Sequence, residues 1–218
     1  DQFPADYIIF SLGTGICEWK TKKILYARHL EGTEVNEIAQ VFMKDKVAFT
    51  IQQPTPDNHC FYYYQTAGAL QDFSKRMEIY ADYVLGDVHK DFYYEEACEV
   101  LAIIPNDQQV IDDYRQKFGK YGIIRTTSPL DGDTVWLEIL PAGVSKGSSA
   151  KWLCKYLGID PQYSLGIGND YNDDELLEFT NHSFMMENGP GVLKKKYTVT
   201  SGNEASGFSH AIKQLIDK

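Results

Sequence analysis

The sequence has little that points to a membrane, a disulfide scaffold or a nucleic-acid partner. No apolar run in its 218 residues approaches the roughly 18 residues of a membrane-spanning helix. Its four cysteines are far apart and form no Cys-x-x-Cys pair, so the spacing indicates neither a zinc site nor a redox pair. A formal net charge of −10 argues against binding to nucleic acid. No signal peptide is visible, and we expect a cytoplasmic protein with reduced cysteines.

What the sequence does contain is the composition of an ordinary globular protein. Hydrophobic residues make up 43% of the chain and charged residues 24%, which is enough for a core within one large domain or two small ones. Strand-like and helix-like segments alternate along the chain, so we predict an α/β fold. Residues 1–24 read as one strand and a turn, residues 25–140 as an inserted α+β unit, and residues 141–218 as part of a parallel sheet.

Hydrophobic periodicity predicts three helices in the middle segment, over 34–44, 67–83 and 108–121. In the first helix one face carries Val35, Ile38, Ala39 and Phe42. We expect Asn106 to cap the third helix, because asparagine is a favoured residue at that position.

Two strand-like runs, over 122–126 and 134–140, flank Asp131-Gly132. An Asp-Gly pair between two such runs is a hairpin-turn signal.

The most informative segment runs from Gly166 to Asp173, with the sequence Gly-Ile-Gly-Asn-Asp-Tyr-Asn-Asp. It follows an apolar, strand-like run and leads into a helical pattern. The turn is therefore rich in carboxylate and amide oxygens and lies at the carboxyl end of a strand, where open α/β sheets bind ligands. Oxygen ligands of this kind suit Mg²⁺, which keeps several waters and commonly shares its shell with a phosphate.

A second informative segment is Val144-Ser145-Lys146-Gly147, which precedes a helical pattern. Ser145 or Ser148 would cap the start of this helix, and Gly158 would end it. Lys146 then lies at a helix N-terminus, where the backbone N–H groups already favour an anion. A lysine directed at a phosphate, together with an acidic metal-binding turn, predicts half of a phosphoryl-transfer site.

These segments resemble motifs of the haloacid dehalogenase (HAD) superfamily, in its Cof-type, type-IIB branch. The segment from Leu137 to Gly147 is similar to the third motif of that branch, and the segment from Gly168 to Asp173 to its fourth. Ser201 to Phe208 is similar to the segment before its last helix, and Asp6 to Ile16 to the strand and turn that lead into its cap domain. The resemblance implies a Rossmann-like core formed by residues 1–24 and 141–218, with an α/β cap domain at 25–140.

The first and second motifs of the family are not found in these residues. The first motif, Asp-x-Asp-Gly-Thr, carries the nucleophilic and general-acid aspartates, and the second supplies a phosphate-binding hydroxyl. Both precede the segment matched by Asp6 to Ile16, so the core resembles a HAD core that is incomplete at its N-terminus. We therefore expect the nucleophile to lie upstream of this chain and the chain alone to be inactive. Asp131-Gly132-Asp133-Thr134 is a poor match to the first motif, and a hairpin turn describes it better.

The resemblance also implies roles for individual residues. Lys146 would stabilise the phosphate charge in the transition state, and Asp173 would orient it. Asn172 would hold the substrate phosphate. Asn169 and Asp170 would bind Mg²⁺, although the family usually has an aspartate where this chain has Asn169, which lowers the charge offered to the metal. The implied activity is Mg²⁺-dependent hydrolysis of a small phosphorylated metabolite, such as a sugar phosphate.

Each of these residues also has a purely structural interpretation. Asn169, Asp170 and Asp173 are residue types that cap helices. Lys146 could be a surface lysine and Asn172 a turn asparagine. Ser11 and Asn203 could line the site or serve only the fold.

Two alternative functions remain. The first is a truncated or degenerate HAD fold that binds metal or phosphate without turnover. The second is an unrelated nucleotide-binding module, for which Gly166-Ile167-Gly168 is a weak indication, because acidic residues in the next turn would repel a pyrophosphate.

Overall fold

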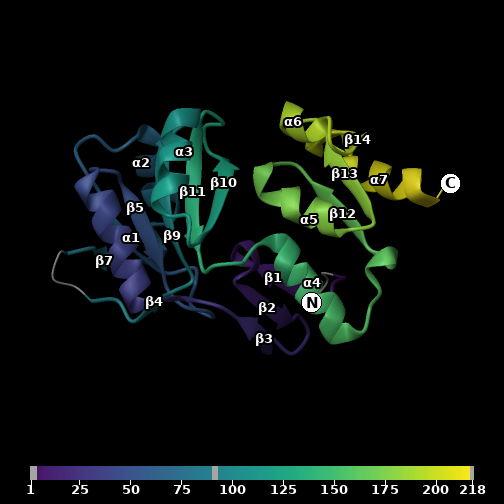
Figure 1. Ribbon diagram of the computed structural model, residues 1–218, viewed down its shortest axis with the longest axis horizontal. Helices are drawn as coiled ribbons and strands as arrows, with labels where there is room; N and C mark the ends of the chain where they lie inside the picture. Colours follow the sequence, from purple (N-terminus) through teal and green to yellow (C-terminus); the bar gives the residue numbers. More distant parts are fainter. Residues whose placement is uncertain (1–3, 90–92, 217–218) are drawn as a thin grey trace. The chain divides into compact units, whose positions relative to one another are not determined.

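The computed structural model describes residues 4–89 and 93–216 and divides into two compact units. The first unit covers Asp1–Val144 and the second Ser145–Lys218. Both units combine helices with strands, which confirms the predicted α/β class (Figure 1). The assignment of residues 1–24 and 141–218 to one domain, with 25–140 inserted, stays a prediction.

The first unit is built around a six-stranded sheet with the order β10-β11-β9-β5-β6-β7. Neighbouring strands are antiparallel, except that β6 and β7 run parallel. The strands are β5 (Phe49–Gln52), β6 (Phe61–Tyr64), β7 (Val84–Asp87), β9 (Glu99–Pro105), β10 (Gly122–Thr127) and β11 (Thr134–Leu140).

The expected hairpin between β10 and β11 is confirmed. Asp131 Oδ1 accepts the backbone N–H groups of Asp133 at 2.8 Å and Thr134 at 3.0 Å, and Gly132 has a φ of +74°. The segment is therefore a turn built by Asp and Gly, as its sequence predicted.

The start of the chain forms more strands than we predicted. The expected strand is β1 (Tyr7–Phe10), but the following residues return as β2 (Gly15–Glu18) and pair antiparallel with it. The reversal takes place at Ser11–Gly13, where all three residues have positive φ. β3 (Ile24–Ala27) completes this three-stranded sheet. A separate pair joins β4 (Leu30–Glu31) to β8 (Glu96–Ala97).

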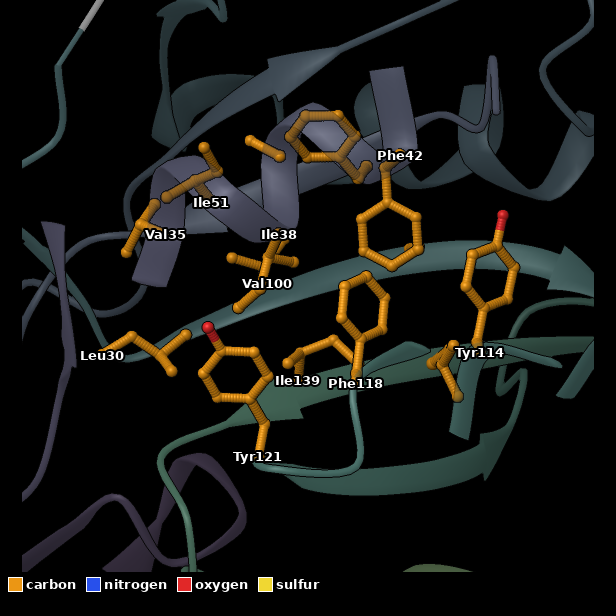
Figure 2. Packing of buried hydrophobic residues seen from close by; sticks show 14 of the residues in the cluster. Leu30, Val35, Ile38, Phe42, Ile51, Val100, Tyr114, Phe118, Tyr121 and Ile139 are labelled. Carbon is orange, nitrogen blue, oxygen red and sulfur yellow. The ribbon is translucent and has the colours of Figure 1, made fainter. Parts of the chain in front are cut away.

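Helices α1 (Gly32–Lys44) and α3 (Gln108–Lys117) share the larger hydrophobic core with one face of the six-stranded sheet. The predicted face of α1 is confirmed, because Val35, Ile38, Ala39 and Phe42 are all buried. Phe42 is fully buried, and its ring centroid lies 5.2 Å from those of both Tyr114 and Phe118 (Figure 2).

Helix α2 (Gln71–Ile79) covers the opposite face of the same sheet. Successive residues of β9 alternate between the two cores, so Val100 belongs to the larger core, while Leu101 packs with Phe73 of α2. α2 is shorter than the predicted helix over 67–83. It begins after Leu70, which has extended backbone angles, and a 3-10 turn (Ala81–Tyr83) follows its end.

The predicted cap of α3 was wrong by one residue. Asp107 is the N-cap, and its Oδ1 accepts the N–H groups of Gln109 and Val110. Asn106 instead accepts a hydrogen bond from Arg125 Nη2 on β10, at 2.8 Å. α3 also ends at Lys117, earlier than predicted, since Phe118 leaves helical geometry.

Charged side chains are buried between α2 and the sheet. The carboxylate of Asp72 accepts hydrogen bonds from Trp136 Nε1 at 2.7 Å and from Ser128 Oγ at 3.0 Å. The guanidinium of Arg76 lies 4.5 Å from the centre of the Trp136 ring. Burial raises the pKa of Glu99 on β9, while the positive charge of Arg76 acts in the opposite direction.

The second unit contains a three-stranded parallel sheet in the order β12-β13-β14. Its small core is formed by Leu177, Met185 and Leu193. The strands are β12 (Leu165–Gly168), β13 (His182–Met186) and β14 (Thr198–Thr200), and the helices are α4 (Lys146–Leu157), α5 (Asp174–Phe179), α6 (Gly191–Lys194) and α7 (Gly207–Ile216).

Across residues 4–89 and 93–216, none of the helices has both the length and the apolar character required to cross a membrane. The cytoplasmic location stays a prediction.

Candidate functional site

The oxygen-rich turn lies where the sequence predicted it, at the carboxyl end of β12. The strand ends at Gly168, a 3-10 turn (Tyr171–Asp173) follows, and α5 begins directly after it. Gly168 is required because a Cβ atom there would overlap with the side chain of Asp173. The glycines of this segment are thus explained by close packing, and no nucleotide is needed to account for them.

Asp173 organises the turn. One carboxylate oxygen, Oδ2, accepts the backbone N–H groups of Asn169 at 2.8 Å and Asp170 at 3.1 Å. Asp173 is buried, and with Asp170 it forms a capping box around the 3-10 turn. The capping interpretation is therefore correct for these two residues, but it uses only one of the two oxygens of Asp173.

Helix α4 has the boundaries that its sequence predicted. Ser145 is the N-cap, and its Oγ accepts the N–H of Ser148 at 3.1 Å. The Ser148 hydroxyl in turn accepts the N–H of Ser145 at 2.9 Å, which completes a capping box. Gly158 ends the helix in left-handed conformation. Lys146 is consequently the first residue of α4.

The ammonium group of Lys146 joins the two motifs. Its Nζ donates to Asp173 Oδ1 at 2.6 Å and to Asn172 Oδ1 at 2.9 Å. The Asp173 side chain is only 8% exposed and that of Lys146 30% exposed, so water screens this ion pair less than a pair on the open surface. The lysine is therefore held in one direction, unlike a free surface lysine.

Glu175, which the sequence analysis did not single out, also connects the two motifs. Ser145 Oγ donates to Glu175 Oε2, so the residue that caps α4 is bound to the first turn of α5. Two residues after Ser145, Gly147 packs so closely against the main chain of Glu175 that a Cβ atom on Gly147 would overlap with it. An acidic residue in the first turn of a helix was the available signal, but that signal alone suggests only a favourable interaction with the helix dipole.

The start of α5 carries a second ion pair. Asp174 accepts hydrogen bonds from Lys196 Nζ at 2.9 Å and from Tyr197 Oη at 2.5 Å. Burial alone would raise the pKa of Asp174, but these two hydrogen bonds and the positive charge of Lys196 together outweigh it and lower the pKa below its ordinary value. Asp174 is therefore ionised and paired, and it faces a different cation from Asp173.

The donor set of the turn fits a partial Mg²⁺ shell. Asn169 is exposed and Asp170 is buried, and both carry the hard oxygen atoms that Mg²⁺ prefers. Within the part of the chain that the structure describes, no group of three or more His, Cys, Asp or Glu side chains could hold a metal. One carboxylate and one amide can still suffice, because Mg²⁺ is commonly bound by one or two carboxylates, with waters and substrate phosphate completing its shell.

The other two residues suggested by the resemblance have structural contacts. Ser11 belongs to the first unit, and its Oγ accepts a hydrogen bond from Asn58 Nδ2 at 2.7 Å. Asn203 belongs to the second unit, and its N–H donates to Asn188 Oδ1 at 3.0 Å, beside a groove of about 420 Å³. A role for either residue at the site stays a prediction.

The model of the haloacid dehalogenase-like hydrolase family matches residues 2–212. A protein of Streptococcus pyogenes serotype M6 named as a candidate phosphatase is 40% identical over 101 residues, covering 45% of this chain and 35% of that protein. The phosphoglycolate phosphatase of Pyrobaculum aerophilum is 26% identical over 117 residues, covering 53% of this chain and 48% of that protein. The chain thus spans less than half the length of either relative.

Solved structures share the fold of nearly the whole chain. A sugar phosphatase described as HAD subclass IIB has a TM-score of 0.76 at 16% identity, with 96% of this chain and 75% of that chain covered. A protein of Streptococcus mutans UA159 has a TM-score of 0.77 at 16% identity, with 97% and 77% covered. At such low identity the likeness establishes the fold alone, and it confirms the expected Rossmann-like type of architecture.

Proposed function

The chain belongs to the haloacid dehalogenase-like hydrolase family, and from that premise we propose that the protein hydrolyses a small phosphomonoester of the sugar-phosphate class. The observation that carries the proposal is the Lys146 ammonium, held by Asn172 and Asp173 beside an oxygen-rich turn. A fixed cation next to a site for Mg²⁺ is the arrangement that stabilises charge on a transferring phosphoryl group.

In this proposal Lys146 binds a phosphate oxygen and stabilises the charge that develops in the transition state. Asp173 pairs with the lysine ammonium and fixes its direction, because its Oδ1 accepts from Nζ while its Oδ2 is anchored to the backbone of the turn. Asn172, which already contacts the same ammonium, offers its amide to the substrate phosphate. Fixing these groups in advance lowers the reorganisation that the reaction requires.

Asn169 and Asp170 are the residues that would hold Mg²⁺, which when bound would neutralise charge on the phosphate oxygens. Asp170 is the charged member of the pair. Asn169 supplies a neutral oxygen, so the chain's own contribution to metal affinity comes mainly from Asp170.

Support for a sugar-phosphate substrate comes from the fold likeness to a sugar phosphatase of subclass IIB. Support for phosphatase chemistry in general comes from the two relatives named for that activity. The acidic net charge of −10 is consistent with a site that binds its anionic substrate through local positive charge from Lys146 and the metal.

The test is an assay of phosphate release from a panel of sugar phosphates, with and without Mg²⁺, on the protein that carries this chain. We expect turnover that depends on Mg²⁺ and is lost with chelator. Turnover without any metal dependence would remove the assigned role of Asn169 and Asp170, and the absence of turnover on the whole panel would remove the proposed activity.

A second candidate is a protein that binds metal or phosphate but does no chemistry, and Asn169 favours it because an amide replaces the usual carboxylate. Calorimetry with Mg²⁺ and with inorganic phosphate separates the two. Binding without turnover would support this second candidate, whereas binding with turnover would support the phosphatase.

A further inference from the structure

We propose that Glu175 is a positioning residue for the site: it fixes the start of α4 against the start of α5 and thereby sets the direction of Lys146. The inference rests on the proposed function for its catalytic meaning, but the geometry that carries it lies entirely within the second unit. Glu175 contacts Ser145 and Gly147, the residues on either side of Lys146, and we assign its effect to these two contacts.

The first contact is between side chains. Ser145 Oγ donates a hydrogen bond to Glu175 Oε2. Ser145 Oγ also accepts a hydrogen bond from the N–H of Ser148. The carboxylate therefore determines the rotation of the hydroxyl group, and with it the lone pair that caps α4. Glu175 is an exposed residue, so water competes with this contact, and its role is to orient the hydroxyl group rather than to add much stability.

The second contact is between main chains. Gly147 approaches the carbonyl of Glu175 so closely that no side chain fits between the two helix ends. The same two segments thus meet on both sides of Lys146, through Ser145 before it and Gly147 after it. Lys146 is therefore held at its own backbone as well as at its Nζ.

The geometry of the lysine depends on this attachment. The 2.6 Å distance from Lys146 Nζ to Asp173 Oδ1 joins α4 to the turn that precedes α5, two residues before Glu175. If the helix ends separate, the flexible lysine chain can still reach Asp173, but from a different direction. Catalysis by a fixed charge is sensitive to such a change, because misplacement by about 1 Å can cost about 100-fold in rate.

The experiment compares Glu175→Ala and Glu175→Gln with Glu178→Ala. Glu178 is an exposed glutamate of the same helix and serves as the matched control. We expect Glu175→Ala to lower kcat about 10- to 100-fold, in the range typical of residues that orient a site from behind, with KM changed less than about threefold. Glu175→Gln keeps a hydrogen-bond acceptor for Ser145 and should retain most of the activity, and Glu178→Ala should retain all of it.

A double-mutant cycle with Ser145→Ala tests whether Glu175 acts through the serine. If both act through one hydrogen bond, the double variant loses little more kcat than the worse single variant. Fully additive losses would overturn the proposed route. Equal kcat for wild type and Glu175→Ala, with only the midpoint of unfolding lowered, would show that Glu175 serves stability alone and would overturn the inference.

A readout without turnover separates this inference from the proposed function. In protein labelled with ¹⁵N-lysine, the ammonium of Lys146 should exchange slowly with water because Asn172 and Asp173 hold it, and the signal is assigned by its loss in Lys146→Arg. We expect the slow signal to disappear in Glu175→Ala and persist in Glu175→Gln. If no substrate is turned over, the proposed function fails, while this signal still decides the role of Glu175.

Discussion

The contacts that stabilise the interior of the first unit differ in kind from those within the second unit. In the first unit, aromatic and aliphatic side chains on both faces of a six-stranded sheet form two cores, and its buried charges lie beneath α2. In the second unit the buried hydrophobic cluster around Leu177, Met185 and Leu193 is smaller, and many of the close contacts are hydrogen bonds around Ser145, Lys146 and Asp173. The first unit is organised by packing, and the second by the groups that would do the chemistry.

Substitutions in the two units should therefore affect different measured quantities. A substitution in the aromatic core should lower the free energy of unfolding, because the core residues contribute to stability mainly by packing. A change among the polar groups of the second unit should appear in turnover, because those groups are fixed by a few directional contacts.

The largest expected effect is on stability. Phe42→Ala should lower the free energy of unfolding by about 3–5 kcal/mol, because it removes a fully buried ring that packs on Tyr114 and Phe118 and leaves a cavity. Urea denaturation followed by circular dichroism measures it. Ile79→Ala is the control, since Ile79 is 58% exposed and its loss should change stability by less than about 0.5 kcal/mol. Similar values for the two variants would contradict the picture of a packing-dominated unit.

The next effect is on turnover. Lys146→Ala should lower kcat about 100- to 1,000-fold, as expected for removal of one group that stabilises transition-state charge. Lys151→Ala, an exposed lysine of the same helix, should leave kcat unchanged. Steady-state kinetics on the best substrate measures both. A loss of less than threefold for Lys146→Ala would remove the lysine from the proposed site.

A smaller effect is expected from pH. Because burial raises the pKa of Glu99 in the folded protein above its ordinary value of 4.5, its favourable contribution is complete below pH 4.5 and is lost as the pH rises through the raised value. Glu99→Gln cannot ionise, so the variant should gain about 1–3 kcal/mol relative to wild type between pH 4.5 and pH 8. Urea denaturation at both pH values measures the gain. Equal changes in the two proteins would show that folding does not raise the pKa of Glu99.

The smallest effect concerns a helix cap in the first unit. Asp107→Ala should cost about 1 kcal/mol, because the N–H groups of Gln109 and Val110 lose their acceptor. Asn106→Ala removes the contact with Arg125 but not the cap, so it should cost less. The reverse order in urea denaturation would mean that the original sequence prediction of Asn106 as the cap describes the protein in solution.

The sequence predicted best those elements whose residues repeat at a regular interval. The buried face of α1 and the hairpin at Asp131-Gly132 follow from local patterns, and both are confirmed. The cap of α3 could not be predicted in this way, because Asn106 and Asp107 are both good caps and the choice depends on Arg125, 19 residues away. A turn after β1 was expected, but the tight reversal that returns the chain as β2 was missed, because neither Ser11 nor Leu12 usually adopts positive φ.

For the site, the sequence identified the groups but not all of their connections. Lys146, Asn172 and Asp173 were named from their motifs, and the structure brings these three together. Glu175 was not found, since its partner Ser145 is 30 residues away in the chain and no local pattern links them. Assignments that depend on a bound metal, at Asn169 and Asp170, stay predictions.

Gly168 limits how the sequence of this turn can change. A Cβ atom at position 168 would overlap with the Cβ atom of Asp173, and every residue other than glycine has such an atom. Alanine at 168 would therefore fit without rearrangement only opposite glycine at 173, and glycine offers Lys146 no carboxylate. The two positions cannot vary independently: as long as the turn keeps this backbone and its acid, the strand before it must end in glycine.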